Sequence, residues 1–148
     1  MMEFYKRLEN RRIVIMGCGR LGANLADDLY EQGHQVIIVD NDEDAFRKLS
    51  SSSYGGLTFM SDATELKTFD QLEINEDTVL IVVTDNDNTN ILISQVAREV
   101  YHVKTIICRL YDPQRECVYD EFHIDTICPT YLSVHRIEEI LKERRAEL

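Results

Sequence analysis

Apolar residues recur along this chain in two alternating patterns, short continuous runs and longer stripes with helical spacing. Three runs are apolar throughout: Ile13–Met16, Val36–Val39 and Val79–Val83. Such runs are typical of parallel strands that are buried on both faces of a sheet. Between the first two runs, Leu21, Leu25 and Leu29 share one helix face, and Gly33 follows where a helix commonly ends.

The alternation continues to the end of the chain. Further strands are expected at 57–60, 105–109 and 126–128, and helices at about 45–49, 64–72, 91–100 and from 131 onward. Asp112-Pro113 has the form of a helix start, with proline at the first helical position. This order predicts one α/β domain over 1–148, a Rossmann-like, doubly wound parallel sheet of six strands in the order 3-2-1-4-5-6.

The last predicted helix is amphipathic. Its apolar stripe consists of Val134, Ile137, Ile140 and Leu141. A terminal helix of this kind either covers its own sheet or packs against a second copy of the chain. The pattern does not distinguish these two arrangements.

A glycine-rich segment lies between the first strand and its helix. Gly17-Cys18-Gly19-Arg20-Leu21-Gly22 has the form G-x-G-x-x-G, and Asp40 ends the next strand 18 residues later. The first glycine permits a tight turn, the second lets a pyrophosphate approach the backbone, and the third lets helix and strand pack closely. The free N–H groups of the helix start would then face an anion. The alternative is a tight turn that binds nothing.

Asp40 indicates which dinucleotides fit. A carboxylate at this strand end accepts hydrogen bonds from ribose hydroxyls and repels a 2′-phosphate, and the following segment from Asn41 to Asp44 holds no Arg or Lys. We therefore expect NAD(H) or ATP/ADP, with AMP possible and NADP disfavoured. Asp40 could instead serve as a turn or capping carboxylate. Arg20 could reach a phosphate or stay in solvent.

Net charge and cysteine spacing exclude several other classes of protein. The formal charge of −11 disfavours nucleic acid and anionic membrane surfaces as partners. No apolar run is long enough to span a membrane, and MMEFYKRLENRR is unlike a signal peptide. Cys18, Cys108, Cys117 and Cys128 lack C-x-x-C spacing, which favours buried, reduced thiols in a cytoplasmic protein without a metal site.

Several segments together resemble a known family. They are the glycine motif, Gly33-His34, Asp40, Ser61-Asp62-Ala63-Thr64, Thr84-Asp85-Asn86-Asp87 with Asn90, Ala97-Arg98, and Arg109 with Asp112-Pro113. From about Arg12 to Pro129, the chain resembles the TrkA-N domain, also called the KTN or RCK N-terminal domain. The resemblance implies a nucleotide-binding domain that regulates a membrane potassium transporter or channel. It also implies pairing of such domains, with the terminal helix reaching across to the partner.

The resemblance also implies where the nucleotide lies. Asp62 and Ala63 would be near the adenine, and Ser61 stands where the family usually has glycine. Thr84, Asp85 and Asn86 follow the fourth strand at the same carboxyl edge of the sheet, where ligands of α/β proteins bind. Helix N-capping is the alternative role for these residues. The predicted binding residues are Gly17, Cys18, Gly19, Arg20, Leu21, Gly22, Asp40, Asn41, Ser61, Asp62, Ala63, Thr84, Asp85 and Asn86.

The sequence favours a sensor over an enzyme. None of the seven tyrosines has a lysine four residues later, and no histidine pairs with a carboxylate at a strand end. We therefore predict no catalytic residue. The alternative is a small NAD-dependent oxidoreductase subunit whose partner supplies the substrate domain.

Overall fold

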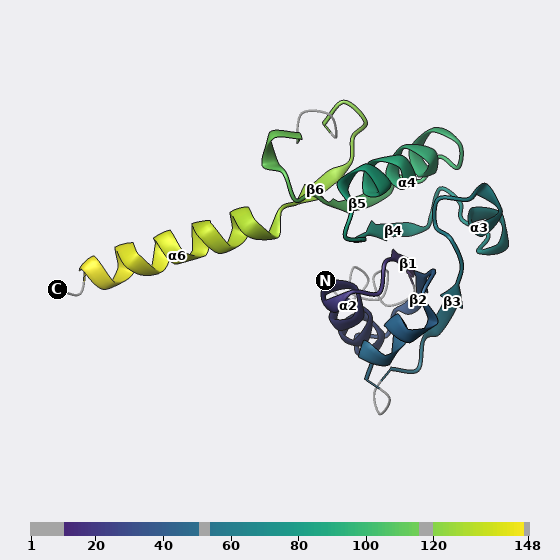
Figure 1. Ribbon diagram of the computed structural model, residues 1–148, viewed down its shortest axis with the longest axis horizontal. Coiled ribbons are helices and arrows are strands. Elements are labelled where there is room, and N and C mark those ends of the chain that lie inside the picture. Colours follow the sequence, from purple (N-terminus) through teal and green to yellow (C-terminus); the bar gives the residue numbers. More distant parts are fainter. Residues whose placement is uncertain (1–10, 51–53, 116–119, 147–148) are drawn as a thin grey trace, which may run out of the picture.

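The computed structural model describes residues 11–50, 54–115 and 120–146. Its six strands form one sheet in the order β3-β2-β1-β4-β5-β6 (Figure 1). All five neighbouring pairs are parallel. The predicted Rossmann-like topology is therefore confirmed.

The strands are β1 Arg12–Met16, β2 Gln35–Asp40, β3 Leu57–Met60, β4 Val79–Val82, β5 Thr105–Arg109 and β6 Asp125–Ile127. The α-helices are α2 Arg20–Glu31, α3 Leu66–Gln71, α4 Asp87–Glu99 and α6 Pro129–Ala146. Two short 3₁₀ helices complete the described elements, η1 Glu43–Lys48 and η2 Pro113–Arg115.

Each face of the sheet has its own hydrophobic core. Ile13 and Ile15 of β1 belong to a cluster that includes Ala23 and Ala26 of α2. The alternate residues of β1 belong instead to a cluster with α3 and α4 on the other face. Successive side chains of a strand point to opposite faces, so a fully apolar strand supplies both cores at once.

The turn from β1 to α2 is held very close to the sheet. Gly17 has a φ of +113°, and a Cβ placed on it would lie 2.9 Å from backbone atoms of Val83 and Thr84. A Cβ on Gly22 would lie 2.0 Å from the carbonyl oxygen of Gly17. Only glycine fits at either position without displacing backbone.

Several element boundaries differ from the sequence prediction. The segment after β2 forms the 3₁₀ helix η1, and the described residues directly after Asp112 form the 3₁₀ helix η2. Helix α3 begins at Leu66 and not at Thr64, because Thr64 takes part in a turn with Asp62. Strand β6 lies one residue earlier than expected, and α6 begins at Pro129, a residue suited to the first helical turn.

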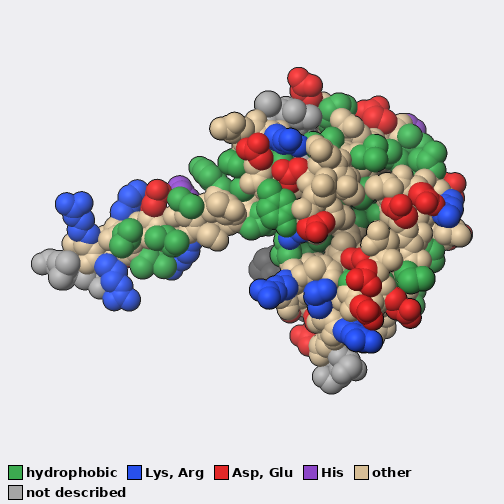
Figure 2. All heavy atoms as spheres, viewed as in Figure 1, with side chains coloured by type: hydrophobic (Ala, Val, Ile, Leu, Met, Phe, Trp, Pro, Cys, Tyr) green, Lys and Arg blue, Asp and Glu red, His purple; other side chains and the backbone are tan. Residues whose placement is uncertain are grey.

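Helix α6 extends away from the sheet (Figure 1). No described residue of α6 is buried. Figure 2 shows hydrophobic side chains gathered along it, with basic side chains on either side. The exposed apolar residues are Tyr131, Leu132, Val134, Ile137, Ile140 and Leu141. The alternative in which this helix covers its own sheet is therefore excluded.

Burial of the cysteines agrees only in part with the prediction. Cys18 and Cys108 are buried, whereas Cys128 is half-buried, so the expectation was wrong for Cys128. Its position between β6 and α6, at the root of the projecting helix, explains the exposure. Cys117 lies outside the described residues. Within the described ranges, no helix is both long and apolar enough to cross a membrane.

Gly19 and Gly22, two of the three glycines around the start of α2, provide a matched pair for a stability test. We expect Gly22→Ala to lower the free energy of unfolding by ~1–3 kcal/mol, the usual cost of overpacking. Gly19→Ala should cost less, below ~1 kcal/mol, because a Cβ at Gly19 meets nothing within 4 Å and only the preference of a helix N-cap for glycine over alanine is lost. Denaturant unfolding followed by circular dichroism measures both. Equal stability of the two variants would contradict the close packing at Gly22.

Candidate functional site

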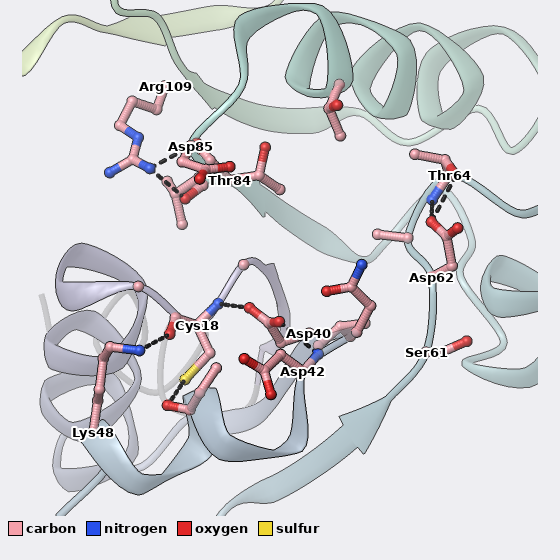
Figure 3. Close-up of a pocket in the computed structure, with 18 residues that line it drawn as sticks. Cys18, Asp40, Asp42, Lys48, Ser61, Asp62, Thr64, Thr84, Asp85 and Arg109 are labelled. Carbon is pink, nitrogen blue, oxygen red and sulfur yellow. Dashed lines mark hydrogen bonds between the residues drawn. The ribbon is translucent and has the colours of Figure 1, made fainter.

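A cleft of about 440 Å³ lies at the carboxyl edge of the sheet (Figure 3). Its walls come from the ends of β1, β2, β3, β4 and β5 and from the segments that follow them. The lining residues are Gly17, Cys18, Gly19, Val39, Asp40, Asn41, Asp42, Ala45, Lys48, Ser61, Asp62, Ala63, Thr64, Val83, Thr84, Asp85, Thr89 and Arg109. Ten of the predicted binding residues are among them.

Asp40 joins two segments of the cleft wall. Its Oδ2 accepts a hydrogen bond from the backbone N–H of Cys18 at 2.9 Å, and its Oδ1 accepts one from that of Asp42 at 2.9 Å (Figure 3). The carboxylate therefore ties the glycine turn to the end of β2. Each oxygen keeps a lone pair for a further donor, so these contacts leave room for ribose hydroxyls. The turn role that was one alternative for Asp40 is thus present, since the Asp42 N–H donates to it from two residues later, whereas the helix cap is Asp42, which accepts from the N–H of Asp44.

The start of α2 lacks a side-chain cap. Gly19 is its N-cap residue, and the first turn holds no acidic side chain. The N–H groups of this turn and the positive end of the helix dipole are thus open to an anion. The space beside Gly19 is also open, since an added Cβ would meet nothing within 4 Å. An anion can approach the backbone here.

Cys18 lines the cleft, but its thiol is buried and has the properties of an unreactive cysteine. The side chain is 1% exposed, and Sγ lies 3.4 Å from the carbonyl oxygen of Ala45. Burial raises the pKa of the Cys18 thiol to about 11, and the charge of Asp40 adds to the rise. A neutral thiol at physiological pH is a poor nucleophile.

Residues after β3 form a turn of their own. Thr64 donates to Asp62 Oδ1 from both its N–H, at 2.9 Å, and its hydroxyl, at 2.6 Å. These hydrogen bonds hold the pKa of the Asp62 carboxyl below its ordinary value. The hydroxyl of Ser61, where the family usually has glycine, lies 2.7 Å from that of Thr68. A serine is accommodated here because it gains a polar partner.

Thr84 and Arg109 form the opposite end of the cleft. The Arg109 guanidinium donates from Nη2 to the carbonyl oxygens of Val83 and Thr84, at 2.8 and 2.6 Å, and lies over the ring of Tyr111. Its Nε–H is buried and has no hydrogen-bond partner among the described residues. Figure 3 shows Arg109 and Asp62 on opposite sides of the cleft.

Four predicted binding residues do not line the cleft. Arg20 is exposed, and Leu21 packs against the core beneath α2. Gly22 is buried in the contact with Gly17. Asn86 caps α4, because its side-chain oxygen accepts from the N–H of Thr89 at 3.0 Å. The capping alternative therefore describes Asn86.

The sequence prediction omitted the two cations of the cleft. Lys48 places its Nζ 3.5 Å from the carbonyl oxygen of Cys18, and Arg109 reaches the site from β5. No local pattern marked Lys48, whereas Arg109 belonged to a noted motif and ends a predicted strand. Other lining residues missed were Val39, Asp42, Ala45, Thr64, Val83 and Thr89.

Carboxylates outnumber cations around the cleft. Asp40, Asp42, Asp62 and Asp85 face Lys48 and Arg109. Such a lining penalises ligands with many negative charges unless a cation accompanies them. Among the described residues, no group of three or more His, Cys, Asp or Glu side chains is arranged to hold a metal ion.

The topology and cleft define a Rossmann-like domain with a pocket at the point where the strand order reverses. The TrkA-N domain family matches residues 13–129. The chain belongs to this family. It is 41% identical over 115 residues to the Trk system potassium uptake protein TrkA of Streptomyces coelicolor, covering 78% of this chain and 51% of the relative. A TrkA homolog of Methanothermobacter thermautotrophicus is 30% identical, with coverage of 87% and 59%. The chain thus spans about half the length of these relatives.

Solved structures share the fold. The TrkA-N domain of inner membrane protein ybaL from Escherichia coli has a TM-score of 0.77 at 16% identity, covering 88% of this chain and 96% of that one. The Shewanella denitrificans Kef CTD in its AMP-bound form has a TM-score of 0.72 at 20% identity, with coverage of 86% and 77%. GsuK bound to ADP has a TM-score of 0.65 at 16% identity, with coverage of 80% and 31%.

Proposed function

We propose that the cleft binds an adenine nucleotide and that the domain is a regulatory part of a potassium transport system. The observation that carries the binding proposal is the uncapped start of α2, which opens beside Asp40 with free space at Gly19. Phosphates would lie against the backbone from Gly19 onward, and the ribose on Asp40. Solved neighbours with bound AMP and ADP support the same class of ligand.

The extent of the cleft favours a ligand longer than a mononucleotide. Its lining runs across five neighbouring strand ends, from Asp62 after β3 to Arg109 in β5. At about 4.8 Å per strand, this span is roughly 19 Å. We assign the adenosine half to the β1–β3 side, and the second half of NAD(H), or the outer phosphates of ATP or ADP, to Thr84 and Arg109. AMP would occupy the first half alone.

The excess of carboxylates in the cleft lining also favours ligands with fewer negative charges. A 2′-phosphate would meet the carboxylates of Asp40 and Asp42, so NADP is disfavoured. NAD(H) carries fewer phosphate charges than ATP and is the better match to a cleft with four carboxylates and two cations. We assign no catalytic role, because the described residues of the lining include no histidine or tyrosine and the one thiol is protonated.

The proposed partner is a membrane potassium transporter or channel, approached from the cytoplasm. The naming of the relatives as potassium uptake proteins supports this proposal. The net charge of −11 disfavours direct contact with anionic lipid, so attachment would run through protein surfaces. A nucleotide can shift such an assembly only by the difference in its affinity for two conformations.

Removing the Asp40 carboxylate tests the ribose contact. We expect Asp40→Ala to weaken NADH or ADP binding by ~1–3 kcal/mol, the range for a hydrogen bond to a charged group. Titration calorimetry gives the affinity, and Asp28→Asn, an exposed carboxylate of α2, is the matched control. Because Asp40 also holds Cys18, thermal unfolding must show that the variant is folded. Wild-type affinity in a folded Asp40→Ala variant would rule out the contact.

We also propose that the exposed face of α6 pairs two copies of the chain. Val134, Ile137 and Leu141 have the spacing of one helix face and are exposed, at 49%, 58% and 64%. An apolar face of this kind is unfavourable in water unless a partner covers it.

The pairing makes a specific prediction for oligomeric state. The 148-residue chain should be a dimer at micromolar concentration, and a chain shortened to residues 1–129 should be monomeric. Ile137→Lys should weaken the dimer, whereas Glu139→Lys, which adds a lysine on the other side of α6, should not. Light scattering measures all four proteins. A dimer that survives removal of α6 would place the interface elsewhere.

Measurements of potassium flux test the proposed regulatory role of the domain. The domain should co-purify with a candidate potassium transporter, and potassium flux through the complex in vesicles should change when NADH or ADP is added. The complex with Asp40→Ala should need a higher nucleotide concentration for the same effect. A stable complex whose flux ignores every adenine nucleotide would leave a structural subunit, without a sensor function.

A further inference from the structure

A buried side chain holds together the end of the cleft formed by Thr84 and Arg109. Asn90 lies in the first turns of α4 and is 0% exposed. Its Nδ2 donates to the carbonyl oxygens of Thr84, at 3.1 Å, and Arg109, at 3.0 Å. Its Oδ1 accepts from the N–H of Thr84, at 3.1 Å, and from the Thr84 hydroxyl.

These contacts lie where the ladder between β4 and β5 ends. The last paired residues of the two strands are Val82 and Cys108. Thr84 and Arg109 lie beyond this pair, where the register no longer pairs the two backbones. The Asn90 amide takes over this role, since one side chain satisfies groups of both backbones. It is therefore a bridge between two strand ends that both line the cleft.

Only an amide suits this position. Both of its N–H groups face carbonyl oxygens, while its oxygen faces an N–H and a hydroxyl. A carboxylate of the same shape would keep the acceptor oxygen. Its second, negatively charged oxygen would replace the N–H groups and face the two carbonyl oxygens, which would repel it. An apolar side chain would leave the buried N–H of Thr84 and the carbonyl oxygens without these partners, which is costly.

A nearby residue shows that burial on this face of α4 does not by itself require a partner. Ser94 lies one helical turn after Asn90 and is also 0% exposed, and its hydroxyl has no hydrogen-bond partner among the described residues. By contrast, both N–H groups and the oxygen of the Asn90 amide form hydrogen bonds with segments that line the cleft. The difference separates a polar residue that is merely buried from one that determines the position of its neighbours.

We propose that Asn90 is a positioning residue that sets the second half of the nucleotide site. It does not touch the ligand, and it acts by fixing Thr84 and, through the backbone, the guanidinium of Arg109 that returns to the Thr84 carbonyl. This inference rests on the proposed nucleotide function. It predicts selectivity by ligand length, because AMP ends before Thr84 and NADH reaches it.

The test combines two variants of Asn90 with a matched control. Asn90→Asp removes the donors, Asn90→Leu removes all polar atoms, and Ser94→Ala removes an unpartnered hydroxyl on the same helix face. Calorimetry with AMP measures the affinity of the proposed adenosine half alone, and calorimetry with NADH measures the affinity across both halves. We expect each Asn90 variant to lose at least tenfold in NADH affinity and less than twofold in AMP affinity, with no change in Ser94→Ala. Equal losses for both ligands, or none, would overturn the positioning role.

Amide hydrogen exchange measured without ligand tests the positioning role of Asn90 independently of nucleotide binding. In either Asn90 variant, exchange should rise at 83–86 and 109–111 and stay unchanged at 17–19 and 40–42. If wild-type protein binds no nucleotide, the proposed function fails, and this exchange pattern alone decides the role of Asn90. Unchanged exchange near Thr84 in both variants would contradict it.

Discussion

The close approach of the glycine turn to the sheet is the constraint on which the cleft depends. Gly22 would place a Cβ 2.0 Å from the Gly17 carbonyl oxygen, and Gly17 itself lies against the backbone at Val83. Because this contact leaves no room for side chains, α2 starts directly at the end of β1. Its uncapped first turn consequently opens onto the point where the strand order reverses. A bulkier turn would displace the helix start from the cleft.

Asp40 extends this constraint to the rest of the site. The carboxylate that is expected to hold a ribose also accepts from the N–H groups of Cys18 and Asp42. The proposed ribose contact and the shape of the turn therefore depend on one side chain. On the other side of β1, Asn90 and Arg109 hold Thr84 in an equivalent way, with side chains that satisfy strand-end backbone. At these positions, hydrogen bonds from side chains to backbone hold the shape of the cleft.

The sequence predicted the order and direction of the strands correctly, because apolar runs and glycines encode them locally. Val79–Val83 is apolar on both faces, which only a central parallel strand requires. The roles of two asparagines could not be read this way: Asn86 caps α4, whereas Asn90, four residues later, bridges two strands. Lys48 and Arg109 reach the cleft through tertiary structure. The pattern of α6 likewise encodes an apolar face but not whether another surface packs against it.

The central claim is that this cleft holds an adenine nucleotide, and the most direct test is to identify what the protein carries. Purified protein is denatured, and the released small molecules are analysed by mass spectrometry beside an Asp40→Ala sample prepared in the same way. The account predicts an adenine nucleotide, NAD(H) before ATP, ADP or AMP, at near-stoichiometric amounts in wild-type protein and at reduced amounts in the variant. Protein that releases none, and that takes up none of these nucleotides on addition, would contradict it.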